Sequence, residues 1–252
     1  MQAFDRLVTI MTRLREECPW DKKQTHTSLL KYLLEETYEV VDAIESEDDE
    51  EICEELGDLL LQVVFHAEIA RQESRFDIAD ICDTISDKME RRHPHVFGDT
   101  KVTGVKDVLR NWEAIKADEK GKRTLDGVPR NMPALLRAYR VQGKASKVGF
   151  DWKQTIDAFP KIEEEVAELK EALESGNPEH FEEELGDLLF AVVNVARHQH
   201  VDPERALRYA TQKFQRRFNK VEDAILEQGK TMRESSLEEM DALWDSHKAM
   251  EK

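Results

Sequence analysis

An acidic pattern that occurs twice constrains this chain more than any other feature of its sequence. In each half, two glutamates, a two-residue gap and a third glutamate are followed, after a spacer of fifteen residues, by Glu-Leu-Gly-Asp. Aligned without a gap, residues 32–68 and 161–197 are identical at 17 of 37 positions. Such agreement at one fixed offset indicates an internal repeat, so we expect two domains with the same fold.

The repeat preserves carboxylates, which a repeat kept only for packing would not require. The first-half quartet comprises Glu36, Glu39, Glu55 and Asp58, and the second-half quartet comprises Glu165, Glu168, Glu184 and Asp187. Within each pair the acids are three residues apart, so on a helix both side chains project from one face.

Hydrophobic residues recur at helical spacing through most of the chain, whereas strand-like alternation is hard to find. The expected helices cover residues 29–44, 52–70, 77–92, 162–173, 181–199 and 204–228. We therefore predict an all-α protein of two tandem repeated helical-bundle domains, covering residues 1–122 and 131–252. The glycines, proline and charges near residues 117–131 suit an exposed connection, and we assign the linker to residues 123–130.

Composition excludes several classes of partner. A net charge of −17 and a pI near 5.0 argue against binding to nucleic acid, whose partners carry basic surfaces. Three cysteines without a Cys-x-x-Cys pair fit neither a disulfide framework nor a zinc site. No signal peptide is recognisable and no apolar stretch is long enough to span a bilayer. We expect a cytoplasmic protein that binds neither nucleic acid nor membrane.

The two acidic helices of each half are joined by a short connection, so they should pack antiparallel and bring each quartet together. Four facing carboxylates repel one another unless a cation lies between them. Ligands that are all oxygen select hard ions, so Mg²⁺ is expected, with Mn²⁺ as a possible substitute. A di-iron centre would need Glu-x-x-His pairs on two helices, but Glu90-x-x-His93 has no counterpart in the second half.

The alternative is a solvated acidic helix face, since 36% of the residues are charged. Two observations favour a metal site. Asp58 and Asp187 follow Leu-Gly and precede Leu-Leu, so their surroundings should be buried, where a carboxylate is costly unless it is paired or ligates metal. Gly57 and Gly186 lie within helices, which predicts close approach of a neighbouring helix or a ligand.

These motifs resemble the MazG nucleoside triphosphate pyrophosphohydrolases. The resemblance covers nearly the whole chain, including Cys18-Pro-Trp-Asp21, Glu90-Arg-Arg-His-Pro-His95 and the Lys-x-x-Arg-Arg elements at 88–92 and 213–217. It implies a fold similar to the dimeric dUTPases. It also implies Mg²⁺-dependent hydrolysis of nucleoside triphosphates to the monophosphate and pyrophosphate, with a metal-activated water attacking the α-phosphorus.

The resemblance further implies roles for individual residues of the second half. Glu165, Glu168, Glu184 and Asp187 would hold Mg²⁺, with Glu164 beside them as a fifth catalytic acid that orients water or ligand. Substrate contacts are assigned to Lys161, His180, Asn194, Lys213, Arg217 and Trp244. Some of these residues have an alternative role. Lys213 and Arg217 could form surface salt bridges, and Trp244 could pack in the core or a dimer interface. The amide of Asn194 could be hydrogen-bonded to a neighbouring side chain.

The halves differ in their substrate set. Lys161 and Asn194 align with Tyr32 and Phe65, so we predict that the second half holds the main active site. Weak metal binding, regulation or a different substrate are the alternatives for the first half. We also expect a homodimer whose sites are completed across subunits. A helical protein that binds metal or a partner without turnover is the competing function, and guanosine polyphosphates are a further candidate substrate.

Overall fold

The computed structural model describes residues 2–118 and 123–250. Over these ranges the chain forms helices and connecting turns without a β-strand, which confirms the all-α prediction. Contacts divide the chain into two compact units, residues 1–121 and 122–252. The predicted end of the first domain, residue 122, lies outside the described residues, and the predicted linker 123–130 contains turns but no helix. No helix within the described ranges is long and apolar enough to cross a membrane.

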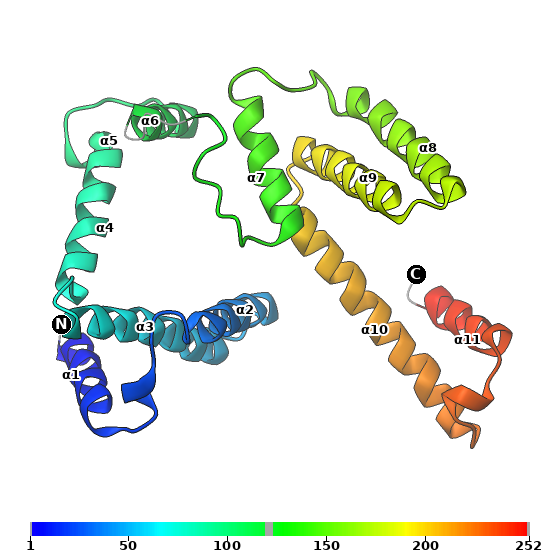
Figure 1. The fold of residues 1–252 in the computed structure, drawn as a ribbon, viewed down its shortest axis with the longest axis horizontal. Helices are drawn as coiled ribbons and strands as arrows, with labels where there is room; N and C mark the ends of the chain where they lie inside the picture. Colours follow the sequence, from blue (N-terminus) through cyan, green and yellow to red (C-terminus); the bar gives the residue numbers. More distant parts are fainter. Residues whose placement is uncertain (1, 119–122, 251–252) are drawn as a thin grey trace. The chain divides into compact units, whose positions relative to one another are not determined.

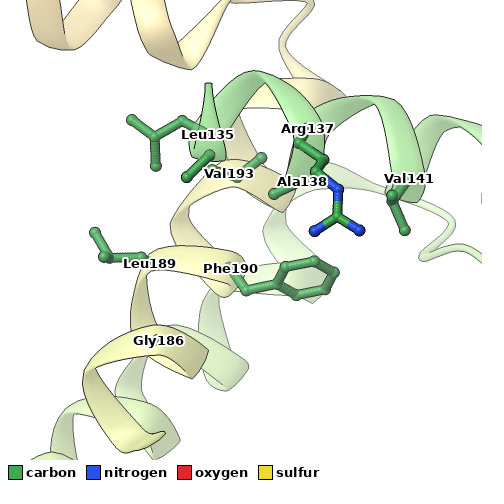
Figure 2. A pocket seen from close by; sticks show the side chains of 9 residues that line it. Leu135, Arg137, Ala138, Val141, Gly186, Leu189, Phe190 and Val193 are labelled. Atoms are coloured by element: carbon green, nitrogen blue, oxygen red, sulfur yellow. The ribbon is translucent and has the colours of Figure 1, made fainter. Parts of the chain in front are cut away.

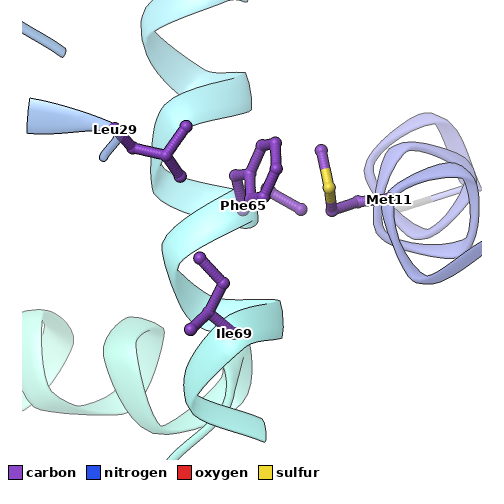
Figure 3. Packing of buried hydrophobic residues seen from close by; sticks show 5 residues of the cluster. Met11, Leu29, Phe65 and Ile69 are labelled. Carbon is purple, nitrogen blue, oxygen red and sulfur yellow. The ribbon is translucent and has the colours of Figure 1, made fainter. Parts of the chain in front are cut away.

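The first unit is built around two packed helices that carry its acids (Figure 1). Its elements are α1 (Gln2–Glu17), η1 (Asp21–Lys23), α2 (Leu30–Ser46), α3 (Asp49–Gln72), α4 (Ile78–Arg92), α5 (Pro94–Phe97) and α6 (Val105–Asp118). The core cluster comprises Met11, Leu29, Val64, Phe65 and Ile69. Figure 3 shows Met11 of α1 facing Phe65 of α3. This contact fixes α1 against the second acidic helix.

The second unit repeats the packed pair. Its elements are α7 (Ala134–Ser146), η2 (Thr155–Ala158), α8 (Phe159–Ser175), α9 (Pro178–His198), α10 (Pro203–Glu227), η3 (Met232–Glu234) and α11 (Leu237–Met250). Helices α7 and α8 both pack against α9. Figure 1 shows α10 leading away from α8 and α9, with α11 beside its second half.

The same turn closes both acidic hairpins. Gly176 ends α8 in the left-handed conformation with φ 67°, and Asn177 caps α9 by accepting hydrogen bonds from two backbone amides. In the first half Glu47 takes the left-handed conformation with φ 58°, and Asp48 caps α3. A glutamate is uncommon there because its Cβ is crowded. Packing of α2 on α3 therefore imposes the turn even where glycine is absent.

Candidate metal centre

The hairpin of α8 and α9 brings the second-half quartet together. One carboxylate oxygen from each of Glu165, Glu184 and Asp187 lies within 4.8 Å of the others. Glu165 is buried, with 4% of its surface exposed, and its Oε2 has no hydrogen-bond partner among the described residues. A buried carboxylate oxygen without a partner is costly, so this donor set suits a hard cation.

Glu168 belongs to the same cluster although it lies outside the tightest group. Partial burial raises the pKa of Glu168 above its usual value, and a hydrogen bond with the Glu165 carboxyl raises it further. The negative charge of Glu184 acts in the same direction. The four acids therefore interact electrostatically as one centre.

Two basic side chains border this centre. Lys161 Nζ lies 2.7 Å from Glu165 Oε1 and 2.9 Å from Glu164 Oε1, and these hydrogen bonds raise the pKa of Lys161. His180 Nε2 lies 3.2 Å from Glu184 Oε1. Both groups come from the helices that carry the acids, at spacings of three or four residues. Lys161 and His180 therefore lie at the edge of the acidic centre, one on each of its two helices.

The side-chain amide of Asn194 is hydrogen-bonded to a neighbouring arginine. Its Oδ1 accepts a hydrogen bond from Arg197 Nη2 at 2.7 Å, which is the alternative assignment for this amide. Arg197 also binds Asp151, and His198 Nε2 lies 3.0 Å from the same carboxylate. Partial burial acts to raise the pKa of Asp151, but the hydrogen bonds and charge of Arg197 outweigh it and hold that pKa below its usual value. Sequence reasoning missed this cluster, although Asp151-Trp-Lys-Gln-Thr155 resembles Asp21-Lys-Lys-Gln-Thr25 of the first half.

Three predicted substrate residues lie on α10 and α11. Arg217 Cζ lies 5.9 Å from the ring centroid of Trp244, and the rings of Phe214 and Trp244 are 5.1 Å apart. We call Lys213, Phe214, Arg217 and Trp244 the α10–α11 cluster. Figure 1 shows α10 leading away from α8 and α9, and α11 packs against α10.

The first half forms an equivalent acidic centre. One oxygen from each of Glu36, Glu39 and Glu55 lies within 4.8 Å of the others. Burial raises the pKa of Glu36, as does the nearby charge of Asp58. Partial burial, followed by the charge of Glu39, raises the pKa of Glu55. The four acids of this half therefore also act as one group.

The surroundings of the first-half quartet are aromatic. Tyr32, at the position of Lys161, packs edge-on against Trp20 with ring centroids 5.8 Å apart. Phe65, at the position of Asn194, is buried in the core cluster. Arg92 Cζ lies 5.2 Å from the ring centroid of Trp112, which parallels the pairing of Arg217 with Trp244. The repeat therefore includes this cation–aromatic pair, which the sequence comparison did not find.

One expectation about the Leu-Gly-Asp segments was wrong and a second was wrong in part, while the approach of a ligand to the glycines stays a prediction. Asp187 is exposed and Asp58 only half-buried, and the neighbouring Leu56 and Leu185 are 48% and 39% exposed. A Cβ added at Gly57 or Gly186 would meet nothing within 4 Å. These faces of α3 and α9 are therefore uncovered by the described parts of the chain, and no neighbouring helix explains the glycines.

Gly186 instead borders an open groove of about 410 Å³ between α7 and α9 (Figure 2). The groove is lined mainly by apolar side chains: Leu135, Ala138, Val141, Leu189, Phe190 and Val193. An uncovered apolar groove beside an acidic centre can receive a ligand or another protein chain.

The raised carboxyl pKa values predict how magnesium affects stability. In metal-free protein, a raised pKa at Glu36, Glu55 and Glu168 gives stability that is present at low pH and lost as pH rises through that pKa. A cation replaces the proton, so saturating Mg²⁺ should raise the melting temperature by roughly 5–10 °C near neutral pH. The increase should be much smaller at about pH 5. Thermal unfolding with and without Mg²⁺ at both pH values checks this, and an equal shift at both would contradict it.

Comparison with known proteins finds the same repeat. The MazG nucleotide pyrophosphohydrolase domain matches residues 24–97 and 154–222, each of which contains one quartet. The nucleoside triphosphate pyrophosphohydrolase/pyrophosphatase MazG of Thermotoga maritima is 50% identical over 250 residues, covering 97% of this chain and 95% of its own. The nucleoside triphosphate pyrophosphohydrolase of Escherichia coli K12 is 47% identical over 260 residues, covering 100% of this chain and 99% of its own. A solved MazG-related protein of Thermotoga maritima aligns with 44% of this chain and 97% of its own at 28% identity and a TM-score of 0.40.

Proposed function

Because the chain belongs to the MazG nucleotide pyrophosphohydrolase family, we propose that it hydrolyses nucleoside triphosphates to the monophosphate and pyrophosphate with Mg²⁺ held by the second-half quartet. The observation that supports this most strongly is the gathering of Glu165, Glu184 and Asp187 within 4.8 Å, with one buried oxygen of Glu165 unpartnered. The relatives named for this activity cover nearly the whole chain.

The proposed hydrolysis uses the acids of the quartet together with the basic side chains at its border. When bound, Mg²⁺ would neutralise the triphosphate and make a bound water more acidic. Lys161 and His180 border the quartet, from where they would bind phosphate oxygens and stabilise charge on the departing pyrophosphate. Glu164 is exposed beside Lys161, where it can orient the attacking water. Attack at the α-phosphorus then needs no protein nucleophile.

A homodimer would explain why the described surface is so apolar. Large hydrophobic side chains are exposed on α9 and α10: Leu185, Leu189, Phe190, Val192, Phe214 and Phe218. Exposed apolar helix faces of this kind usually mark a protein interface. Helix α11, which carries Trp244, packs against α10, and α10 leads away from α8 and α9 (Figure 1). We therefore propose that a second copy covers these faces and that its α10–α11 cluster supplies the remaining phosphate and base contacts.

A screen of all ribonucleoside and deoxyribonucleoside triphosphates with product analysis tests the reaction. We expect pyrophosphate and monophosphate in equal amounts, and no turnover after removal of divalent cations. A nucleoside diphosphate and inorganic phosphate as products would contradict attack at the α-phosphorus. No turnover of any triphosphate or guanosine polyphosphate would favour a protein that binds metal or a partner without catalysis.

A further inference from the structure

Gln62 is a buried amide at the edge of the first-half quartet. It lies on α3, one turn after Asp58, and 6% of its surface is exposed. Its Nε2 donates a hydrogen bond to Glu36 Oε1 at 3.4 Å. Its Oε1 is buried and has no hydrogen-bond partner among the described residues. Buried amide oxygens are nearly always paired, so this atom indicates a missing donor or cation.

The orientation of the amide is chemically determined. Turning it over would place Oε1 against the carboxylate of Glu36, where two acceptors repel each other. With Nε2 on Glu36, the carbonyl oxygen is left over beside the acids. An amide oxygen is a hard ligand and also a good acceptor for water bound to a divalent cation. Gln62 therefore both holds one acid of the quartet and offers the centre a further oxygen.

The two halves differ at the positions that set the charge of each centre. Gln62 aligns with Ala191, and Tyr32 aligns with Lys161. Lys161 already places a positive charge on Glu165. Within residues 2–118 and 123–250, no ion pair joins a lysine or arginine to the first-half quartet. Among the described residues, the first-half centre therefore has no ion pair like the one that Lys161 makes with Glu165.

We propose that Gln62 completes the first-half quartet as a divalent-cation site that fills without nucleotide, whereas the second-half site fills together with nucleotide. A cation entering the second-half quartet must compete with Lys161, and phosphate oxygens remove that competition by binding the lysine. At the first-half quartet no lysine has to be displaced, and the amide oxygen of Gln62 supplies a ligand without any need for phosphate. This inference rests on the proposed function in taking Mg²⁺ or Mn²⁺ as the ligand of both quartets.

Calorimetric titration of the full chain with Mn²⁺ alone tests the first-half site. In Glu184→Gln/Asp187→Asn, where the second-half site is disabled, we expect one cation per chain without nucleotide. Adding Gln62→Met should weaken that binding about 10–100-fold, as loss of a supporting ligand does. The matched control is Gln142→Met. This glutamine is equally buried and also has an unpartnered Oε1, but it donates to the carbonyl of Phe190 instead of a quartet acid.

Unchanged affinity in Gln62→Met, or equal weakening in Gln142→Met, would overturn the role of Gln62. Should Gln62→Met unfold, Gln62→Glu replaces it as the test. Its added carboxylate should tighten Mn²⁺ binding, and an unchanged affinity would overturn the proposal. Absence of Mn²⁺ binding in Glu184→Gln/Asp187→Asn, while the wild type still releases pyrophosphate only with a divalent cation, would refute this inference and leave the proposed function intact.

The second-half site gives the reciprocal test. In Glu36→Gln/Glu55→Gln, nucleotide-free binding of Mn²⁺ should be weak, and adding Lys161→Met should tighten it about tenfold or more. The control is Lys170→Met, an exposed lysine later on the same helix. Tight nucleotide-free binding before Lys161 is changed would contradict the proposed difference between the sites. Loss of divalent-cation dependence in the wild type's pyrophosphate release would instead refute the proposed function itself.

Discussion

Replacing Glu184 with glutamine and Asp187 with asparagine should lower pyrophosphate release by at least about 10²–10³-fold, the loss typical of removing a preorganised electrostatic contact. Both changes preserve side-chain size and remove charge from α9. Because Asp187 is exposed and Glu184 only half-buried, the α8–α9 pair should remain folded. Steady-state release of pyrophosphate, with far-ultraviolet circular dichroism as the fold control, measures the effect.

The repeat supplies a matched comparison at the same spacing. Glu55→Gln/Asp58→Asn removes the corresponding charges from α3 and should lower pyrophosphate release by less than about tenfold. The reason is that the first half has Tyr32 and buried Phe65 in place of Lys161 and Asn194. Losses of similar size in the two double variants would show that both halves turn over substrate, or that they depend on each other. A larger loss from the first-half variant would reverse our ranking.

Much of the fold could be predicted from local signals. The sequence Ser-Gly-Asn-Pro at 175–178 predicts a helix end, a turn and a new helix, and each of these is present. Helical spacing then places both pairs of acids on facing surfaces. In the second half, the gathering of Glu165, Glu184 and Asp187 within 4.8 Å follows from these two facts.

What could not be predicted depends on contacts distant in sequence or on surfaces that one chain leaves open. Asp151 binds Arg197, 46 residues later, and no periodic pattern links the two. Leucines flanking Asp58 and Asp187 suggested a buried setting, because hydrophobicity alone does not distinguish a core from an uncovered interface. Gly186 likewise suggested a neighbour, but the space opposite it is an open groove (Figure 2).

Mixing two inactive variants should restore pyrophosphate release if a second copy completes the site. One variant, Glu184→Gln/Asp187→Asn, lacks the second-half quartet, and the other, Arg217→Ala/Trp244→Ala, lacks the α10–α11 cluster. Each alone should be nearly inactive. In a mixed dimer, the intact quartet of one chain meets the intact α10–α11 cluster of the other, so one of the two sites is whole. Random exchange of equal amounts should therefore recover about a quarter of the wild-type activity.

The size of the recovery distinguishes the possible arrangements. If each chain used its own α10–α11 cluster, no mixed dimer would contain a whole site, and the mixture would stay as inactive as its components. A monomer would give the same result. Sedimentation of the wild type distinguishes a monomer from a dimer in which each chain uses its own cluster. Arg217 lies over the ring of Trp244, so removing both side chains together leaves neither member of this pair without the other. Recovery that rises with the time allowed for subunit exchange would identify a site built from two chains.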